Sequence, residues 1–119
     1  MLRMLLMNND RFKVINNIKL FIKYVDNIIV NYPRCSFNLK NRLENTCYDV
    51  LELLYLANII KDRQLYQRQI ISKINMLDFY LELSYDKKYI SLKSLNKGVR
   101  QLDTISKMIL GWAKNNNEC

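Results

Sequence analysis

This 119-residue chain is 50% hydrophobic and 25% charged, a composition that belongs to one folded domain and excludes an intrinsically disordered chain. Its 19 Lys and Arg outnumber its 11 Asp and Glu, and the resulting formal charge of +8 favours polyanionic partners such as nucleic acid or an acidic membrane surface. The chain has no histidine and only two glycines, which argues against His-dependent catalysis and against a glycine-rich phosphate loop. We therefore predict that the protein is not an enzyme and holds no metal or cofactor.

Residues 1–9 are predicted to be a short N-terminal extension. Its apolar opening, MLRMLLM, is too short for a signal sequence or a membrane span, so we expect a cytoplasmic protein without a membrane partner. Cys35, Cys47 and Cys119 are odd in number and form no C-x-x-C pair. This pattern argues against a disulfide framework or a zinc knuckle and favours reduced thiols.

Four helices are predicted in residues 10–114, because apolar residues recur there at steps of three and four. The first helix extends from Asp10, the expected N-cap, to Asn31 and ends before Pro33. The second covers about residues 39–57, the third about residues 62–85, and the fourth starts at Ser91 and continues to residue 114, before a tail at 115–119. The apolar stripes are Val14, Ile18, Phe21, Val25 and Ile28; Leu39, Leu43, Cys47, Val50, Leu54 and Ala57; Tyr66, Ile70, Ile74, Leu77, Leu81 and Ser84; and Leu92, Leu95, Val99, Leu102, Ile105, Ile109 and Trp112.

These elements predict an all-α, antiparallel up-down-up-down four-helix bundle, because short connections force successive helices to run in opposite directions. The stripes on the second and fourth helices are broader than one bundle core requires. The surplus apolar surface predicts a homo-oligomer.

The fourth helix carries the main candidate site, a row of cations in phase with one another and opposite the apolar stripe. The row consists of Lys93, Lys97, Arg100, Lys107 and Lys114, with Asp103 as the only acid of the segment. Such a face favours an anionic partner, and a merely solvated face is the alternative. The second candidate for nucleic-acid binding is a basic group on the third helix, Arg63, Arg68 and Lys73.

Other residues of the helices favour structural roles. The pairs Asp49/Glu52 and Asp78/Glu82 have the spacing of two carboxylates on one helix face, yet they fall between the apolar positions, so surface salt bridges are expected rather than a metal site. The tyrosines are expected to pack their rings rather than stack nucleobases. Gly111 costs about 1 kcal/mol in a helix interior, which indicates a close approach to a neighbouring helix or another subunit. The adjacent Trp112 is predicted to be a buried packing anchor there.

Several short runs carry a family resemblance that spans roughly residues 12–114. They are Tyr32-Pro33-Arg34, Phe37, Leu39, Arg42-Leu43, Leu53-Leu54, Ala57-Asn58, Tyr89-Ile90-Ser91-Leu92, Lys107-Met108 and Leu110-Gly111-Trp112. This pattern resembles the accessory variability determinant (Avd) family, four-helix-bundle proteins of diversity-generating retroelements that are related to the proteins encoded in 23S ribosomal RNA intervening sequences. The ribosomal-RNA branch typically carries Asn-Ile-Ala-Glu-Gly after the second helix. This chain has Asn58-Ile59-Ile60-Lys61-Asp62 there, a departure that favours the retroelement branch.

The resemblance implies a basic, non-catalytic homopentamer that binds the reverse transcriptase of the retroelement and its template RNA, and so supports mutagenic reverse transcription. Lysine and arginine rows would hold RNA, or DNA, through phosphate contacts. Two alternatives stay open. One is a ribosome-associated bundle of the intervening-sequence type, and the other is a structural, protein-binding bundle whose charge only solvates it.

The sequence thus predicts a helical oligomer. Circular dichroism should be dominated by helix, and light scattering should report several subunits, five if the resemblance holds. A monomer at micromolar concentration would contradict the predicted assembly.

Overall fold

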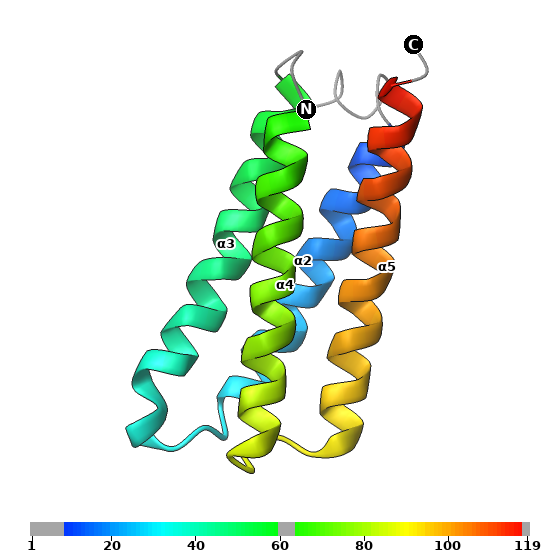
Figure 1. Cartoon of the computed structure of the whole chain (residues 1–119). Coiled ribbons are helices and arrows are strands. Elements are labelled where there is room, and N and C mark those ends of the chain that lie inside the picture. Colours follow the sequence, from blue (N-terminus) through cyan, green and yellow to red (C-terminus); the bar gives the residue numbers. More distant parts are fainter. Residues whose placement is uncertain (1–8, 60–63, 118–119) are drawn as a thin grey trace.

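The computed structural model describes residues 9–59 and 64–117, and the side chains of residues 13–57 and 64–111. Its elements are the α-helices α2 (Asn9–Ile29), α3 (Phe37–Ile59), α4 (Gln64–Asp86) and α5 (Leu92–Asn117), and the short 3-10 helix η1 (Arg34–Ser36). The four α-helices lie side by side in an elongated bundle of 47 × 25 × 22 Å (Figure 1). Helix α2 packs against α3 and α5, and α4 packs against the same two helices, so the protein is an all-α four-helix bundle.

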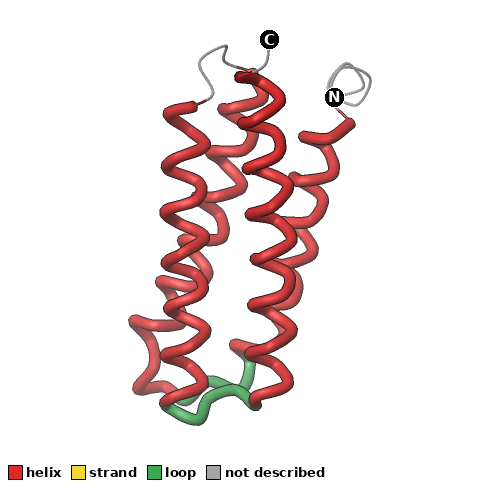
Figure 2. Tube along the Cα trace, turned by 45° about the vertical axis from the view of Figure 1, so that its right-hand side comes forward, coloured by secondary structure: helices red, strands yellow, loops and turns green. Residues whose placement is uncertain are grey.

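Two short connections lie at the same end of the bundle (Figure 2). Helix α2 ends at Ile29, and Pro33 precedes η1 in an extended conformation with φ −71°, as its fixed φ and missing N–H predict. Helix α4 ends in a Schellman-type cap, in which Tyr89 N–H donates to the Ser84 carbonyl at 2.9 Å and Lys88 takes the left-handed position with φ 66°.

The two predicted N-caps have different outcomes. Ser91 is confirmed as the N-cap of α5, because its Oγ accepts the Ser94 backbone N–H at 3.1 Å. Asp10 is wrong as an N-cap, because α2 already includes Asn9 and Asp10 therefore lies inside the helix. Helix α5 also continues to Asn117, three residues beyond the predicted end. Among the described helices, none is both long and apolar enough to cross a membrane.

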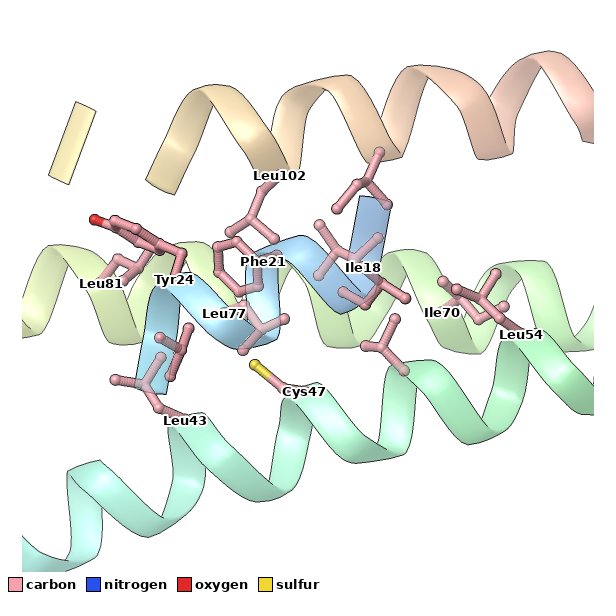
Figure 3. Close-up of a cluster of buried hydrophobic side chains, with 14 of the residues drawn as sticks. Ile18, Phe21, Tyr24, Leu43, Cys47, Leu54, Ile70, Leu77, Leu81 and Leu102 are labelled. Carbon is pink, nitrogen blue, oxygen red and sulfur yellow. The ribbon is translucent and has the colours of Figure 1, made fainter. Parts of the chain in front are cut away.

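The core follows the predicted stripes along nearly their whole length. The labelled side chains in Figure 3 come from all four helices and pack against one another: Ile18, Phe21, Tyr24, Leu43, Cys47, Leu54, Ile70, Leu77, Leu81 and Leu102. Each fully buried Leu, Ile or Phe contributes roughly 1.5–3 kcal/mol relative to an exposed one, so this cluster holds the helices together. Burial also raises the pKa of the Cys47 thiol to about 12, which keeps that thiol protonated at neutral pH.

Two expectations about apolar surface need correction. Leu92 is 53% exposed, because it lies ten residues, about 2.8 turns, before the buried Leu102 and so at the edge of the apolar stripe rather than at its centre. We expect the surplus apolar surface on the second and fourth helices, which are α3 and α5. Among the side chains that the structure describes, however, the third helix, α4, carries the largest share of the exposed large hydrophobic residues. The exposed large hydrophobic residues of α4 are Leu65, Met76, Phe79 and Tyr85.

The glycine that permits a close approach is Gly98, not Gly111. A Cβ atom at Gly98 would lie 2.7 Å from Leu81 Cδ1 and 3.0 Å from Tyr24 Cε2, so α5 could not approach α2 and α4 as closely with a side chain there. Gly111 is exposed, and a Cβ atom there would meet nothing within 4 Å. The neighbouring-helix explanation of Gly111 is therefore wrong, whereas the subunit contact stays a prediction. The side chain of Trp112 lies outside the described residues.

The two glycines should respond oppositely to alanine. Gly98→Ala should lower the free energy of unfolding by about 1–3 kcal/mol, because the added methyl group overpacks a fully buried Leu81 and a ring held in place. Gly111→Ala should raise it by about 0.5–1 kcal/mol, since alanine favours the helix and the site is open. Urea unfolding of the two variants checks both signs. A stabilised Gly98→Ala variant would contradict the tight contact.

Candidate nucleic-acid interface

The α5 cation row consists of Lys93, Lys97, Arg100 and Lys107, and all four residues are exposed. Helix α5 buries Leu102, Ile105 and Ile109 on its opposite side. Seven residues, about two helical turns, separate Lys93 from Arg100 and Arg100 from Lys107, so the row extends about 21 Å along the helix. The structure therefore brings these four predicted residues together on one outward face. The fifth, Lys114, lies in the helix, but its side chain is outside the described residues.

The four cations differ in how far their charge is compensated within the chain. Lys107 Nζ lies 3.0 Å from Asp103 Oδ2, an exposed pair of the kind that contributes only a few tenths of a kcal/mol. Lys97 Nζ lies 5.6 Å from the centre of the Tyr24 ring, within cation–π range. Among the described residues, no carboxylate forms an ion pair with Lys93 or Arg100. These two are the best-placed cations for an external anion.

A contact between α2 and α5 sets the position of the row. The Tyr24 hydroxyl donates to the Ser94 carbonyl, and the ring lies against Gly98 while Lys97 lies over it. Burial raises the pKa of Tyr24, so its hydroxyl stays protonated and keeps donating. Sequence reasoning missed both Tyr24 and Gly98. The sequence feature that could have indicated this contact is Gly98 itself, since a glycine on the apolar side of a regular helix points to a close approach by a neighbouring side chain.

Beside the row, a shallow groove lies between α2 and α5, lined by Asn17, Leu20, Gln101 and Thr104. Asn17 Nδ2 donates to Met108 Sδ at 3.1 Å, and within the described part of the chain Gln101 Oε1 has no hydrogen-bond partner. The groove is uncharged, so it adds hydrogen-bonding groups to the row but no attraction for phosphate.

The second candidate group, on α4, has less free charge. Lys73 is half-buried and pairs with Asp49 of α3 at 3.3 Å, and only Arg68 is exposed without an ion pair to any described carboxylate. Arg63 lies outside the described residues. Arg68 and Lys73 line a shallow hollow together with Leu65, Gln69 and Ser72. Phosphate binding therefore favours the α5 cation row.

The acidic residues divide between the expected role and an unexpected one. Asp49 forms the predicted surface salt bridge, but Asp78 does not, because it lies half-buried between α4 and α5 with Glu82 and Asp103 nearby. Burial, and then these two carboxylates, raise the pKa of Asp78, and its Oδ1 has no hydrogen-bond partner among the described residues.

No group of three or more metal-binding side chains occurs in the described ranges. Six tyrosines on or next to α3, α4 and α5 are the candidates for stacking on nucleobases. Tyr80 is buried, Tyr48 and Tyr85 are exposed, and Tyr55, Tyr66 and Tyr89 are half-buried.

No family model matches this chain, and no curated protein or solved structure matches it. The likeness to the Avd family therefore stays a prediction that rests on the residues quoted for it.

Asp78 should make stability depend on pH. The fold raises the pKa of the Asp78 carboxyl above its ordinary value, so the folded state favours the protonated form. The contribution of Asp78 to the free energy of unfolding is therefore most favourable at acid pH and is lost as the pH rises through the raised pKa. Asp78→Asn, which is neutral throughout, should resist urea better than the parent at pH 7, and the gap should narrow as the pH falls. Asp49→Asn is the control, since it removes an ion pair and should bring no gain. Equal urea midpoints for the parent and Asp78→Asn at every pH would contradict this account.

Proposed function

We propose that this protein is a non-catalytic accessory factor that binds RNA, or DNA, through phosphate contacts and works with the reverse transcriptase of a diversity-generating retroelement. The observation that supports nucleic-acid binding is the α5 cation row, exposed along about 21 Å with Lys93 and Arg100 free of ion pairs to the described carboxylates. The reverse transcriptase as partner rests on the sequence resemblance alone.

The mechanism is electrostatic. Each cation that neutralises a phosphate releases a condensed counterion into solution, and this gain in entropy drives binding without reading the base sequence. A row on a rigid helix presents its charges at fixed intervals, so the protein backbone does not have to be ordered when a strand lies along it. The polymerase would supply the chemistry.

We further propose that the bundle is antiparallel and assembles into a cytoplasmic homopentamer. Two contacts support the antiparallel order: Asn17, early in α2, contacts Met108, late in α5, whereas Tyr24, later in α2, contacts Ser94 at the start of α5. In Figure 1 the colours run from blue to cyan down α2 and from yellow to red up α5, which agrees with this arrangement. The number five comes from the resemblance, and exposed apolar residues support self-association in general.

A salt titration of RNA affinity tests the role of the row. Lys93→Gln with Arg100→Gln should weaken binding of a single-stranded RNA and reduce the slope of log K against log salt by about 1.4, since each neutralised phosphate contributes about 0.7. These two residues are chosen because Lys97 also packs on Tyr24 and Lys107 pairs with Asp103. Reversing both charges to Glu should abolish retention at physiological salt while helicity is unchanged.

The matched control removes two exposed cations elsewhere, Lys23→Gln on α2 with Arg42→Gln on α3. It has the same net charge as the test variant, so a difference between the two assigns the effect to the row rather than to overall charge. If both variants bind equally, the RNA surface lies elsewhere. If the parent retains no RNA at physiological salt, the protein-binding alternative replaces this proposal.

A further inference from the structure

The outer face of α4 carries an apolar stripe that faces away from the core. The α4 outer stripe is defined as Leu65, Gln69, Ser72, Met76, Phe79 and Leu83, at alternating steps of four and three residues. This spacing is the seam with which a helix pairs with another helix in a coiled coil. Met76 is 41% exposed and Phe79 is 51% exposed, although Leu77 and Leu81 on the same helix are fully buried. The stripe is therefore a second apolar face that the bundle leaves uncovered.

The two halves of this stripe have complementary shapes. Its C-terminal half has the large side chains of Met76, Phe79 and Leu83. Its N-terminal half is a shallow hollow, where small or polar residues lie between larger ones: Leu65, Arg68, Gln69, Ser72 and Lys73. A helix running in the opposite direction, centred opposite Met76, would place its large half against this hollow.

We propose that two copies of this chain pair through α4, antiparallel and about a two-fold axis near Met76. In this register Phe79 of each copy lies opposite Ser72 of the other, and Leu83 lies opposite Gln69, because each pair is nearly equidistant from Met76. A two-fold contact uses the same patch on both copies, so one self-complementary stripe is sufficient. The occupant of the face is a second copy.

The charges beside the stripe fit the same register. Glu82 and Asp86 follow Arg68 by 14 and 18 residues, about four and five turns, so all three lie along one side of α4. Arg68 lies about 12 Å before Met76, and Glu82 and Asp86 lie about 9 and 15 Å after it. Antiparallel pairing therefore places Arg68 of each copy between Glu82 and Asp86 of the other. All three are exposed, and none forms an ion pair with another described residue.

The same carboxylates argue against RNA as the occupant of this face. Glu82 and Asp86 would repel phosphates beside the stripe, and Lys73 is already paired with Asp49. The pairing thus goes beyond the proposed RNA binding and does not depend on it. A ring of five needs a different, head-to-tail contact, so the pairing through α4 and the proposed ring together predict two paired rings with ten subunits.

Sedimentation of the full chain at micromolar concentration tests the pairing. The parent should contain an even number of subunits, and Phe79→Ser should halve the mass while helicity is unchanged. Leu20→Ser is the matched control, since Leu20 on α2 is 49% exposed, and it should leave the mass unchanged. Arg68→Glu should also halve the mass, because the new carboxylate of each copy would then lie between Glu82 and Asp86 of the other. Adding Glu82→Lys and Asp86→Lys to that variant should restore the mass, because opposite charges would again face each other across the contact.

Disulfide trapping tests the register. In a Cys35→Ser, Cys119→Ser background, Met76→Cys should cross-link to its own copy under mild oxidation, since the two Met76 positions face each other across the axis. Ser72→Cys should not, because the two Ser72 positions lie about 12 Å apart along the helices and a disulfide requires about 7 Å or less between Cα atoms. An odd number of subunits with a mass unaffected by Phe79→Ser, or equal cross-linking at both positions, would overturn the proposal.

Discussion

The burial of the apolar stripe of α5 against α2 and α4 is the constraint on which the rest of this structure depends. Leu102, Ile105 and Ile109 fix the rotation of the helix about its axis, and whatever lies on the opposite side must face solvent. A rotation that moved the cations inward would expose these three side chains, at roughly 1.5–3 kcal/mol each, and bury charge without partners. The outward direction of Lys93, Lys97 and Arg100 is therefore a consequence of core packing.

Core packing sets the direction in which the cations of α5 point, and the contact between Tyr24 and Gly98 sets how closely α5 approaches α2. A glycine costs helix stability, yet here its missing side chain lets a large ring lie between α2 and α5, where Lys97 covers it. Two polar side chains that contact or face α5 elsewhere, or belong to it, are less well satisfied. Gln101 Oε1 and Asp78 Oδ1 lack hydrogen-bond partners among the described residues, on either side of α5.

The sequence predicts those features that depend on one helix at a time, and it fails where two helices must be placed together. Periodicity is a property of a single helix, so the buried positions of α2, α3 and α4 could be predicted, as could the outward face of α5. The choice between Gly98 and Gly111 depends on which glycine faces Leu81 and Tyr24. The buried position of Asp78 and the pairing of Lys73 with Asp49 likewise depend on distances between helices. Leu92 lies at the edge of its stripe, where burial depends on how close the neighbouring helices come and not on spacing alone.

The charges of the molecule are sorted by face, and this sorting is a physical argument for two separate interactions. Helix α5 presents nearly unmixed cations, so its outer face attracts phosphates and repels a second copy of itself. Helix α4 presents apolar side chains flanked by both signs of charge. Its carboxylates repel a polyanion, and its charges are complementary to those of a second α4 that runs in the opposite direction. Because α4 and α5 are neighbours in the bundle, pairing through α4 would bring two cation rows into one assembly. Two linked rows bind one strand more tightly than either row alone, since the second contact is made at high effective concentration.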